Sequence, residues 1–313
     1  MRALGIDTSN YTCSTALYDS ETGQMFMAKQ LLPTPEGALG LRQSQAVFEH
    51  VKLLGQMMDK LFAQAPGRVD AVGVSTRPRS AQGSYMPCFL TGAMAAQCLS
   101  AALGVPKHDF SHQQGHIAAA LYSAEKTDWL TAGRFLAFHV SGGTTDCLLV
   151  TTGNCSIESI ELVGSSLDLK AGQAVDRVGG MLGLPFPSGP SLEQLALRCT
   201  DKIKVKPTLK GIDCCLSGVE NKCAKLLSEG APQEYVARFC IEYIQATLEG
   251  MLKAAKAEYG ELPLLFAGGV MSNSIIRGYF EKRYGASFAQ PAYSADNAGG
   301  IALLAAGMEE RNA

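Results

Sequence analysis

The chain has 313 residues, of which 47% are hydrophobic and 18% charged, a balance typical of a globular protein with one large or two medium domains. Its formal net charge of −2 excludes a global electrostatic attraction to nucleic acid or to an anionic membrane, but it is compatible with a local basic patch. No run of 18 apolar residues predicts a membrane span, and Asp7 comes too early for a signal peptide. The ten cysteines form no CxxC pair and are expected to be reduced thiols, which indicates a cytoplasmic protein.

The first half of the chain predicts a meander of short strands followed by a helix and a further strand. The meander strands are expected over 3–9, 14–18 and 25–29, with polar turns between them. A helix is expected over 43–65, where apolar residues recur at helical spacing at Val47, Val51, Leu54, Met58 and Leu61. The apolar run over 69–75 predicts a buried strand, and helical sequence follows it through residue 102.

The second half repeats this plan. Strands are expected over 135–140, 146–150 and 157–163, with a turn over 141–145 after the first of them. A long helix is expected over 233–258, and a strand over 264–270 mirrors the strand at 69–75. The last helix, expected over 297–309, would return to pack on the first lobe.

The repeated plan indicates an internal duplication and two α/β lobes, 1–110 and 111–313. The alternative is two unrelated α/β domains that are similar by chance. A duplicated meander resembles the actin, sugar-kinase and heat-shock ATPase (ASKHA) fold, and this resemblance implies two turns that grip phosphates across a nucleotide cleft. Asp7 occupies the turn of the first half, where a carboxylate could hold a water bound to a magnesium ion beside phosphates.

Two glycine turns are candidates for nucleotide binding. Gly142 and Gly143 follow a buried strand, and bare backbone lets an anion approach the N–H groups closely, with the Ser141 hydroxyl as a further donor. Gly268 and Gly269 end another strand, just before Asn273. The second turn fits either a tight turn with a helix N-cap or a space for a flat ring that Asn273 would bond.

A pair of histidines, His112 and His116, forms the pattern HxxxH. On a helix this spacing places both imidazoles on one face, where they could share a metal ion, although an exposed helix with two polar residues has the same pattern. Gln113 stands where a zinc peptidase of the HExxH class needs a glutamate as general base, which argues against that class. Asp296 offers a third ligand, or else an N-cap for the last helix.

Taken together, the motifs resemble the tRNA threonylcarbamoyl-adenosine transferase family, called TsaD in bacteria and formerly O-sialoglycoprotein endopeptidase or glycoprotease. The resemblance covers nearly the whole chain in the family's order. The matching motifs are GIDTS at 5–9, HxxGH at 112–116, VSGGxT at 140–145, AGxAxDxVxxxLGLxxPxGP at 171–190, LSGVENK at 216–222, AGGVxxN at 267–273 and ADNAGGIA at 295–302.

The resemblance implies an activity and its residues. In the family, a threonylcarbamoyl group passes from its AMP ester to the exocyclic amine of a tRNA adenosine beside the anticodon, with TsaB-like and TsaE-like partner proteins. Carried over by position, His112, His116 and Asp296 would bind one iron or zinc ion, which would polarise the carbonyl. The contacts to the adenylate would be His139, Val140, Ser141, Gly142, Gly143, Asp176, Gly189 and Asn273.

The sequence departs from the family at four places. Thr144 replaces the histidine after SGG, and Gln173 replaces the glutamate of GEAFD. Residues 76–84, which include Arg77 and Arg79, replace the family's glycine-rich segment, which reads approximately TRGPGLxGSL. Residues 10–13 replace the family's CDET segment. The sequence leaves three functions open: threonylcarbamoyl transfer to tRNA, transfer to another acceptor by a divergent paralogue, or a metallopeptidase-like or ATP-binding scaffold role.

Overall fold

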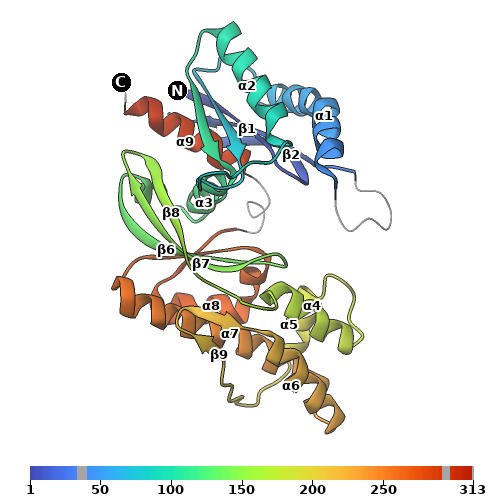
Figure 1. Ribbon diagram of the computed structural model, residues 1–313. Coiled ribbons are helices and arrows are strands. Elements are labelled where there is room, and N and C mark those ends of the chain that lie inside the picture. Colours follow the sequence, from blue (N-terminus) through green and yellow to red (C-terminus); the bar gives the residue numbers. More distant parts are fainter. Residues whose placement is uncertain (34–40, 291–296, 312–313) are drawn as a thin grey trace. The chain divides into compact units, whose positions relative to one another are not determined.

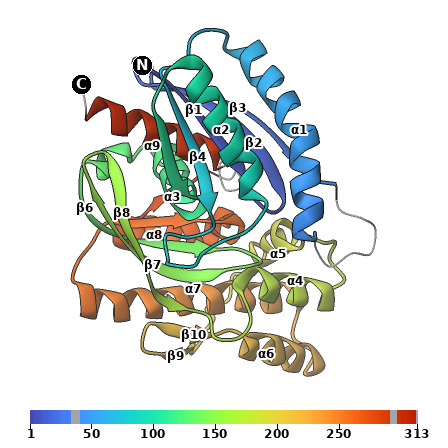
Figure 2. The ribbon, with the colours of Figure 1, turned by 45° about the horizontal axis from the view of Figure 1, so that its top comes forward.

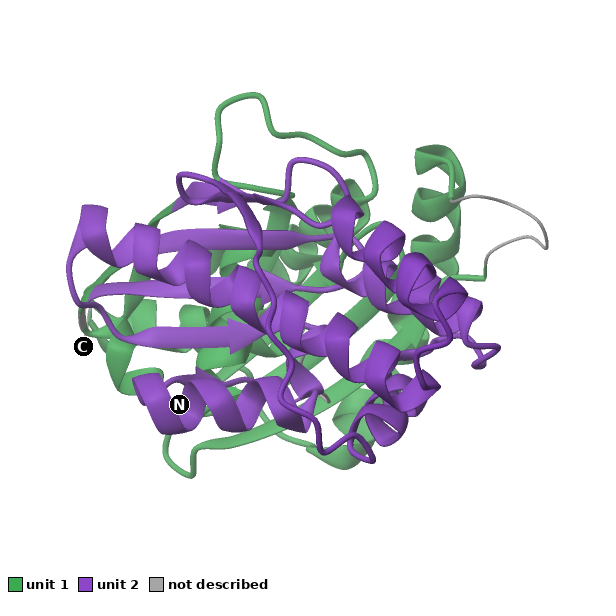
Figure 3. Cartoon of the chain, turned by 90° about the horizontal axis from the view of Figure 1, so that it is seen from below, with its two compact units in different colours: residues 1–133, 151–160, 292–313 green, residues 134–150, 161–291 purple. Residues whose placement is uncertain are grey.

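The computed structural model describes residues 1–33, 41–290 and 297–311. The chain forms two compact units, which Figure 3 shows in different colours. Unit 1 comprises Met1–Gly133, Thr151–Ile160 and Ala292–Ala313, and unit 2 comprises Arg134–Val150 and Glu161–Pro291. The lobe boundary expected between 110 and 111 thus falls inside unit 1. Among the described residues, no helix is long and apolar enough to cross a membrane.

Unit 1 is built on a five-stranded mixed sheet in the order β3-β2-β1-β4-β5, of which Figure 1 labels β1 and β2. The meander β1 (Arg2–Thr8), β2 (Thr12–Asp19) and β3 (Gln24–Leu31) is antiparallel, whereas β4 (Ala71–Arg77) and β5 (Lys107–Ser111) run parallel to β1. The three predicted meander strands are confirmed with bounds that shift by one to two residues. Strand β5 was not predicted as a strand.

The strands of unit 1 alternate large and small side chains, and the two faces of the sheet therefore accept different helices. Leu4, Ile6 and Val72 belong to a core shared with α1 (Gln43–Gln64) and α2 (Phe89–Leu103). Gly5 and Gly73 instead face α9 (Ala298–Glu310), where an added Cβ at Gly5 would lie 2.1 Å from the Ala298 carbonyl oxygen. Helix α3 (His112–Ser123) packs on α9.

Helix α1 was predicted at nearly its observed bounds, but only some of the apolar residues at the predicted helical spacing are buried. Its buried residues are Ala46, Glu49, His50, Leu53, Leu54, Met57 and Leu61. Val51 is 62% exposed, and it lines a groove between α1 and α2 together with Met94. Helix α2 likewise begins only at Phe89, so the helical sequence predicted directly after the strand is wrong for the preceding loop.

Unit 2 repeats the sheet in the order β12-β11-β6-β7-β8, of which Figure 2 labels β6, β7 and β8. Its strands are β6 (Ala132–Val140), β7 (Thr145–Gly153), β8 (Ser156–Ser165), β11 (Leu264–Ala267) and β12 (Ser287–Phe288). Its helices are α4 (Ala171–Met181), α5 (Gly189–Ala196), α6 (Ser217–Ser228), α7 (Gln233–Tyr259) and α8 (Ser274–Tyr284), and a small hairpin joins β9 (Thr208–Lys210) to β10 (Asp213–Cys215). Buried residues of α7, such as Ile244 and Leu248, lie at the centre of the core of this unit.

The two sheets have the same topology, since each meander is followed by two parallel strands added beside its first strand. This identity confirms the predicted duplication and the α/β class. The strand predicted over 264–270 is too long: β11 ends at Ala267, Gly268 takes a positive φ of 101°, and a 3₁₀ turn, η2 (Gly269–Ser272), follows. A left-handed glycine breaks the extended backbone at that point.

Candidate functional site

Helix α3 begins at the histidine pair. Ser111 caps the helix, since its Oγ accepts from the Gln114 backbone N–H at 3.2 Å while the Gln114 Oε1 accepts from the Ser111 N–H at 2.8 Å. The ring centroids of His112 and His116 lie 4.5 Å apart in an edge-to-face arrangement. The predicted helix is confirmed, and the two imidazoles lie on one side of it.

Behind His112 lies a buried carboxylate. Asp7 on β1 is fully buried, and its Oδ1 lies 3.0 Å from His112 Nδ1 and accepts a short hydrogen bond from Ser75 Oγ on β4. Burial alone would raise the pKa of Asp7, but the charge of His112 and the hydrogen bonds from His112 and Ser75 outweigh it and lower the pKa to about 2. The carboxylate is therefore ionised at neutral pH, and it lies within the unit rather than on an open turn.

The chemistry of these residues fits a metal ion. Two imidazoles one helical turn apart are typical ligands of zinc and iron. The Oδ1 of Asn297 is buried without a hydrogen-bond partner in the described part of the chain, and Asn297 Nδ2 lies 3.4 Å from His112 Nε2. Asp296, the expected third ligand, lies outside the described residues, and no group of three potential ligands forms within 1–33, 41–290 and 297–311.

The rewritten loop after β4 packs on the start of α3. Its Pro78 carbonyl accepts from the Gln113 N–H at 3.1 Å, and the Ser80 hydroxyl donates to the Ser111 hydroxyl at 3.1 Å. Among the described residues, neither Arg77 nor Arg79 forms an ion pair. Arg77, the last residue of β4, and Arg79 in the loop therefore bring two positive charges to the end of unit 1 that holds the histidine pair.

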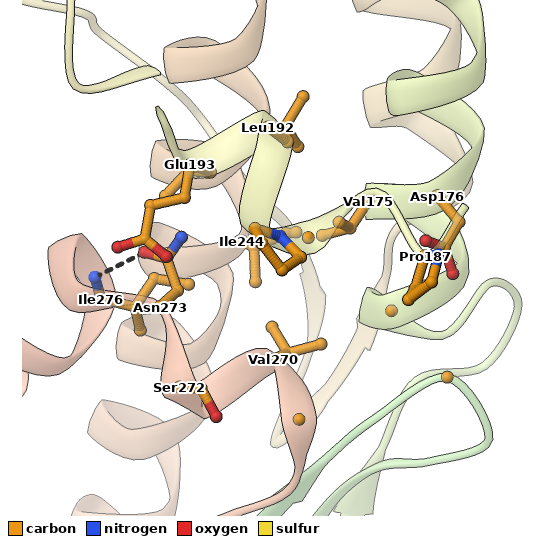
Figure 4. Close-up of a pocket in the computed structure, with 16 residues that line it drawn as sticks. Val175, Asp176, Pro187, Leu192, Glu193, Ile244, Val270, Ser272, Asn273 and Ile276 are labelled. Atoms are coloured by element: carbon orange, nitrogen blue, oxygen red, sulfur yellow. Dashed lines mark hydrogen bonds between the residues drawn. The ribbon is translucent and has the colours of Figure 1, made fainter. Parts of the chain in front are cut away.

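Unit 2 contains a pocket of about 490 Å³ (Figure 4). One wall is apolar, with Ile244, Val270 and Ile276 among its residues, and Asp176, Glu193 and Asn273 supply polar groups. The lining residues are Gly142, Gly172, Val175, Asp176, Pro187, Gly189, Pro190, Leu192, Glu193, Ile241, Ile244, Gly269, Val270, Ser272, Asn273 and Ile276. A mostly apolar pocket of this size with a few polar groups suits a small organic ligand with a flat ring.

The glycines at the pocket have two different roles. A Cβ added at Gly142 or Gly269 would meet no atom within 4 Å, so the fold itself does not need bare backbone at these positions. Gly268, in contrast, has a φ of 101°, and its Cβ would lie 2.3 Å from the Val140 carbonyl oxygen. Gly268 is thus required by the packing, whereas Gly142 and Gly269 leave free space at the pocket wall.

The turn after β6 is held by its own side chains. Ser141 Oγ accepts from the N–H groups of Gly143 and Thr144, each at 3.2 Å, and Thr144 Oγ1 lies 3.3 Å from His139 Nδ1. Of the predicted turn residues, Gly142 lines the pocket, while His139, Val140, Ser141 and Gly143 are not among its lining residues.

Polar residues of the pocket also hold its walls in place. Asp176 Oδ1 accepts from the Ser188 N–H at 2.9 Å, which fixes the loop that leads to Gly189. Asn273 Oδ1 accepts from the N–H groups of Ile275 and Ile276 at 3.1 Å, so the predicted N-cap of α8 is confirmed while the residue also lines the pocket.

Sequence reasoning missed Glu193 and the apolar wall. Glu193 Oε1 accepts from the Ser274 N–H at 2.8 Å and so joins α5 to α8. The sequence signal that could have found Glu193 is its position four residues after Gly189 in a short amphipathic helix, which places it near the predicted site. The isoleucines at 241, 244 and 276 could not be distinguished from core residues. Apolar residues at helical spacing indicate a buried helix face, but they do not show whether that face lines a pocket or packs in the core.

The family model for TsaD, tRNA N6-adenosine threonylcarbamoyltransferase, matches residues 35–303. The chain belongs to the TsaD family. This match spans both units and includes the histidine pair, the turn at Gly142 and the segment at Asn273.

Solved structures similar to this TsaD family member share its fold. HypF from T. kodakarensis superposes with a TM-score of 0.60 at 12% identity, over 99% of this chain and 47% of that one. The (R)-2-hydroxyglutaryl-CoA dehydratase component A from Acidaminococcus fermentans has a TM-score of 0.55 at 15% identity, over 100% of each chain. The Clostridium difficile activator of 2-hydroxyisocaproyl-CoA dehydratase, with bound ADPNP, has a TM-score of 0.53 at 13% identity, over 100% of this chain and 97% of that one. These likenesses confirm the actin-like ATPase fold.

Proposed function

We propose that this TsaD family member transfers a threonylcarbamoyl group from threonylcarbamoyl-AMP to the exocyclic amine of a tRNA adenosine beside the anticodon. The observation that carries the proposal is the histidine pair at the start of α3, in a chain whose family match covers both units. In the reaction the adenosine amine attacks the carbamoyl carbon, the bond from that carbon to the phosphate oxygen breaks, AMP leaves, and the amine loses a proton.

The adenylate is assigned to the pocket of unit 2. The adenine ring would lie against the apolar wall and over Gly269, where no side chain takes up the space. Asn273 caps α8 through its Oδ1, so its Nδ2 remains to donate to a ring nitrogen. Asp176 would accept from a ribose hydroxyl, and the open backbone at Gly142 would leave room for the phosphate. A magnesium ion would accompany ATP if ATP binds in place of the acyl-adenylate.

One iron or zinc ion is assigned to His112, His116 and Asp296, and a bound ion would polarise the carbamoyl carbonyl as a Lewis acid. AMP is a stable leaving group, so no residue needs to act as a hydrolytic base. A peptidase of the HExxH class, in contrast, needs such a base. Gln113 stands at the position of its glutamate and cannot take a proton, which disfavours a peptidase role.

A tRNA acceptor needs a local basic surface, because the net charge of the chain is −2. Arg77 and Arg79 supply positive charge on the loop that packs on α3, without an ion pair among the described residues. Two arginines there would contact backbone phosphates of the anticodon arm. A tRNA acceptor would also place the reaction in the cytoplasm.

A TsaB-like partner fits the outer face of unit 1. Exposed apolar side chains of α1 and α2, including Phe48, Val51, Leu90 and Met94, flank a groove of about 320 Å³ between the two helices. An exposed apolar face on two neighbouring helices is typical of a protein interface. Val51→Glu and Met94→Glu should abolish co-purification of a TsaB-like protein, whereas Lys253→Glu on α7 should not. TsaE-like proteins are the second expected partner.

The function is tested by mass spectrometry of tRNA nucleosides from cells that lack this chain and its paralogues. Restoring the wild-type chain should restore threonylcarbamoyl-adenosine, and restoring His112→Ala should not. A nucleoside that stays absent with the wild type, although metal and nucleotide bind to the purified protein, would favour a divergent paralogue that acts on another acceptor. A chain that binds nucleotide but never turns over would be an ATP-binding scaffold.

A further inference from the structure

The contacts of the buried Asp7 side chain indicate a role beyond filling the core. The side chain is 0% exposed, and its Oδ1 accepts from Ser75 Oγ and contacts His112 Nδ1 at 3.0 Å, while its Oδ2 has no partner in the described part of the chain. Leaving one oxygen of a buried carboxylate unpaired destabilises the fold. The imidazole that lies 3.0 Å from Asp7 Oδ1 is that of a proposed metal ligand.

The two contacts of His112 fit the same imidazole tautomer. The Asp7 oxygen that accepts from Ser75 Oγ lies 3.0 Å from Nδ1 of His112, and an imidazole that carries its proton on Nδ1 can donate to this oxygen. On the other side of the ring, Asn297 Nδ2 lies 3.4 Å from Nε2, a contact that fits an Nε2 without a proton. Phe89 packs on the ring at 5.8 Å between centroids and limits its rotation.

We propose that Asp7 is a positioning residue: it holds His112 as the Nδ1–H tautomer and so presents the Nε2 lone pair to a divalent metal ion. This rests on the metal site proposed above for His112 and His116. The carboxylate orients the imidazole through Nδ1–H, and Ser75 fixes the carboxylate oxygen that accepts. The sequence alone points to a different role for Asp7, in which the carboxylate holds a magnesium-bound water beside phosphates.

The proposal is tested on metal-free protein by long-range ¹H–¹⁵N correlation of the imidazoles, with His112 assigned from the spectrum of His112→Gln. The wild type should show a protonated Nδ1 and an unprotonated Nε2 on His112 above neutral pH. Asp7→Ala should give a mixture of tautomers, whereas Asp7→Asn, which keeps an accepting oxygen, should retain the Nδ1–H form. Thr15→Val is the matched control, because it removes a buried hydrogen bond of the same sheet, from Thr15 Oγ1 to the Met57 carbonyl, without touching His112.

Zinc affinity, measured by competition with a chromophoric chelator, is the second readout. Asp7→Ala should weaken zinc binding by about 10- to 100-fold, Asp7→Asn by less, and Thr15→Val not at all. If Asp7→Ala fails to fold, Ser75→Ala should still shift the tautomer balance of His112 and weaken zinc binding.

The outcomes separate this proposal from the proposed function. A wild-type His112 with its proton on Nε2, or a tautomer and zinc affinity that do not change in Asp7→Ala, would overturn the positioning role. A wild type that shows the expected tautomer, lost in Asp7→Ala, but binds no zinc or iron would support the role of Asp7 and contradict the metal site itself.

Discussion

Gly300 of α9 lies directly on Gly115 of α3: a Cβ added at Gly300 would lie 2.0 Å from the Gly115 carbonyl oxygen and 2.6 Å from the Ala119 nitrogen. A Cβ at Gly115 would in turn meet the Asn297 carbonyl oxygen at 3.0 Å. The glycine of the HxxGH motif therefore serves helix packing. The close approach of the two helices brings Asn297 to the ring of His112.

Gly300→Ala should destabilise the protein by about 3 kcal/mol or more, because the methyl group would overlap backbone atoms that cannot move independently. It should also weaken metal binding by displacing α9 from α3. Gly278→Ala on α8 is the control, because its Cβ meets no atom within 4 Å and the change removes a helix-interior glycine, which should stabilise by up to about 1 kcal/mol. Equal melting temperatures for the two variants would contradict this account of the packing.

Nucleotide binding should depend on free space at Gly142 and Gly269. Valine at either position should weaken binding of AMP or an acyl-adenylate analogue at least tenfold in calorimetry, by roughly 1.4 kcal/mol or more, because its side chain would occupy the pocket. The fold should persist, since an added Cβ meets no atom at these positions. Gly180→Val, at an open position of α4 that does not line the pocket, should leave binding unchanged. Unchanged affinity in both pocket variants would remove the pocket assignment.

The repeated architecture was predictable because strand meanders and helical periodicity are local signals. The meander strands of both halves and the long helices α1 and α7 were predicted close to their observed bounds. Short parallel strands such as β5 were missed, because Lys107–Ser111 has little apolar character and is a strand only through its pairing with β4. The buried face of α1 was misassigned around Val51, because apolar residues occupy two sides of this helix.

The candidate sites were predictable as residue types but not as contacts. Sequence spacing placed His112 and His116 on one helix face, and in the structure the two rings do contact each other. It could not reveal that Asp7 lies behind His112, since the two are 105 residues apart and meet only in the folded unit. Nor could a pair of glycines show that Gly268 serves packing and Gly269 faces the pocket, because that difference lies in φ and in neighbouring atoms.

Stability should fall in mildly acidic solution because of His50. This residue is fully buried on α1, its Nε2 donates to the Ser9 carbonyl at 2.7 Å, and its Nδ1 has no partner in the described part of the chain. Burial lowers the pKa of His50 below 6.5, and the bond to Ser9 and the charge of Asp7 oppose the shift only partly.

The unfolded chain therefore takes up a proton near pH 6.5 that the folded state resists, so the contribution of neutral His50 is full above that pH and decreases as pH falls below it. The slope should be at most about 1.4 kcal/mol per pH unit. Urea denaturation across this range should show a smaller pH dependence in His50→Gln, whose amide can still donate to Ser9. An identical pH dependence in the variant and the wild type would show that His50 does not titrate as described.

Binding of tRNA should depend on salt through Arg77 and Arg79. The double variant Arg77→Ala/Arg79→Ala should bind tRNA more weakly at low salt and with a log–log salt slope lower by about 1 to 2, since each arginine lost is one phosphate contact fewer. Arg283→Ala, at an exposed position on α8, is the control and should leave both quantities unchanged. A double variant with wild-type affinity and slope at every salt concentration would remove the loop from the tRNA surface.

The central claim is tested most directly by incubating the purified, metal-loaded protein with threonylcarbamoyl-AMP labelled in its threonine, tRNA and the partner proteins, and measuring label on tRNA adenosine and released AMP. Transfer should produce one AMP per acyl group on tRNA, and it should be lost in His112→Ala and His116→Ala without loss of the folded protein. Protein that binds metal and adenylate but labels no tRNA, with or without its partners, would contradict the account.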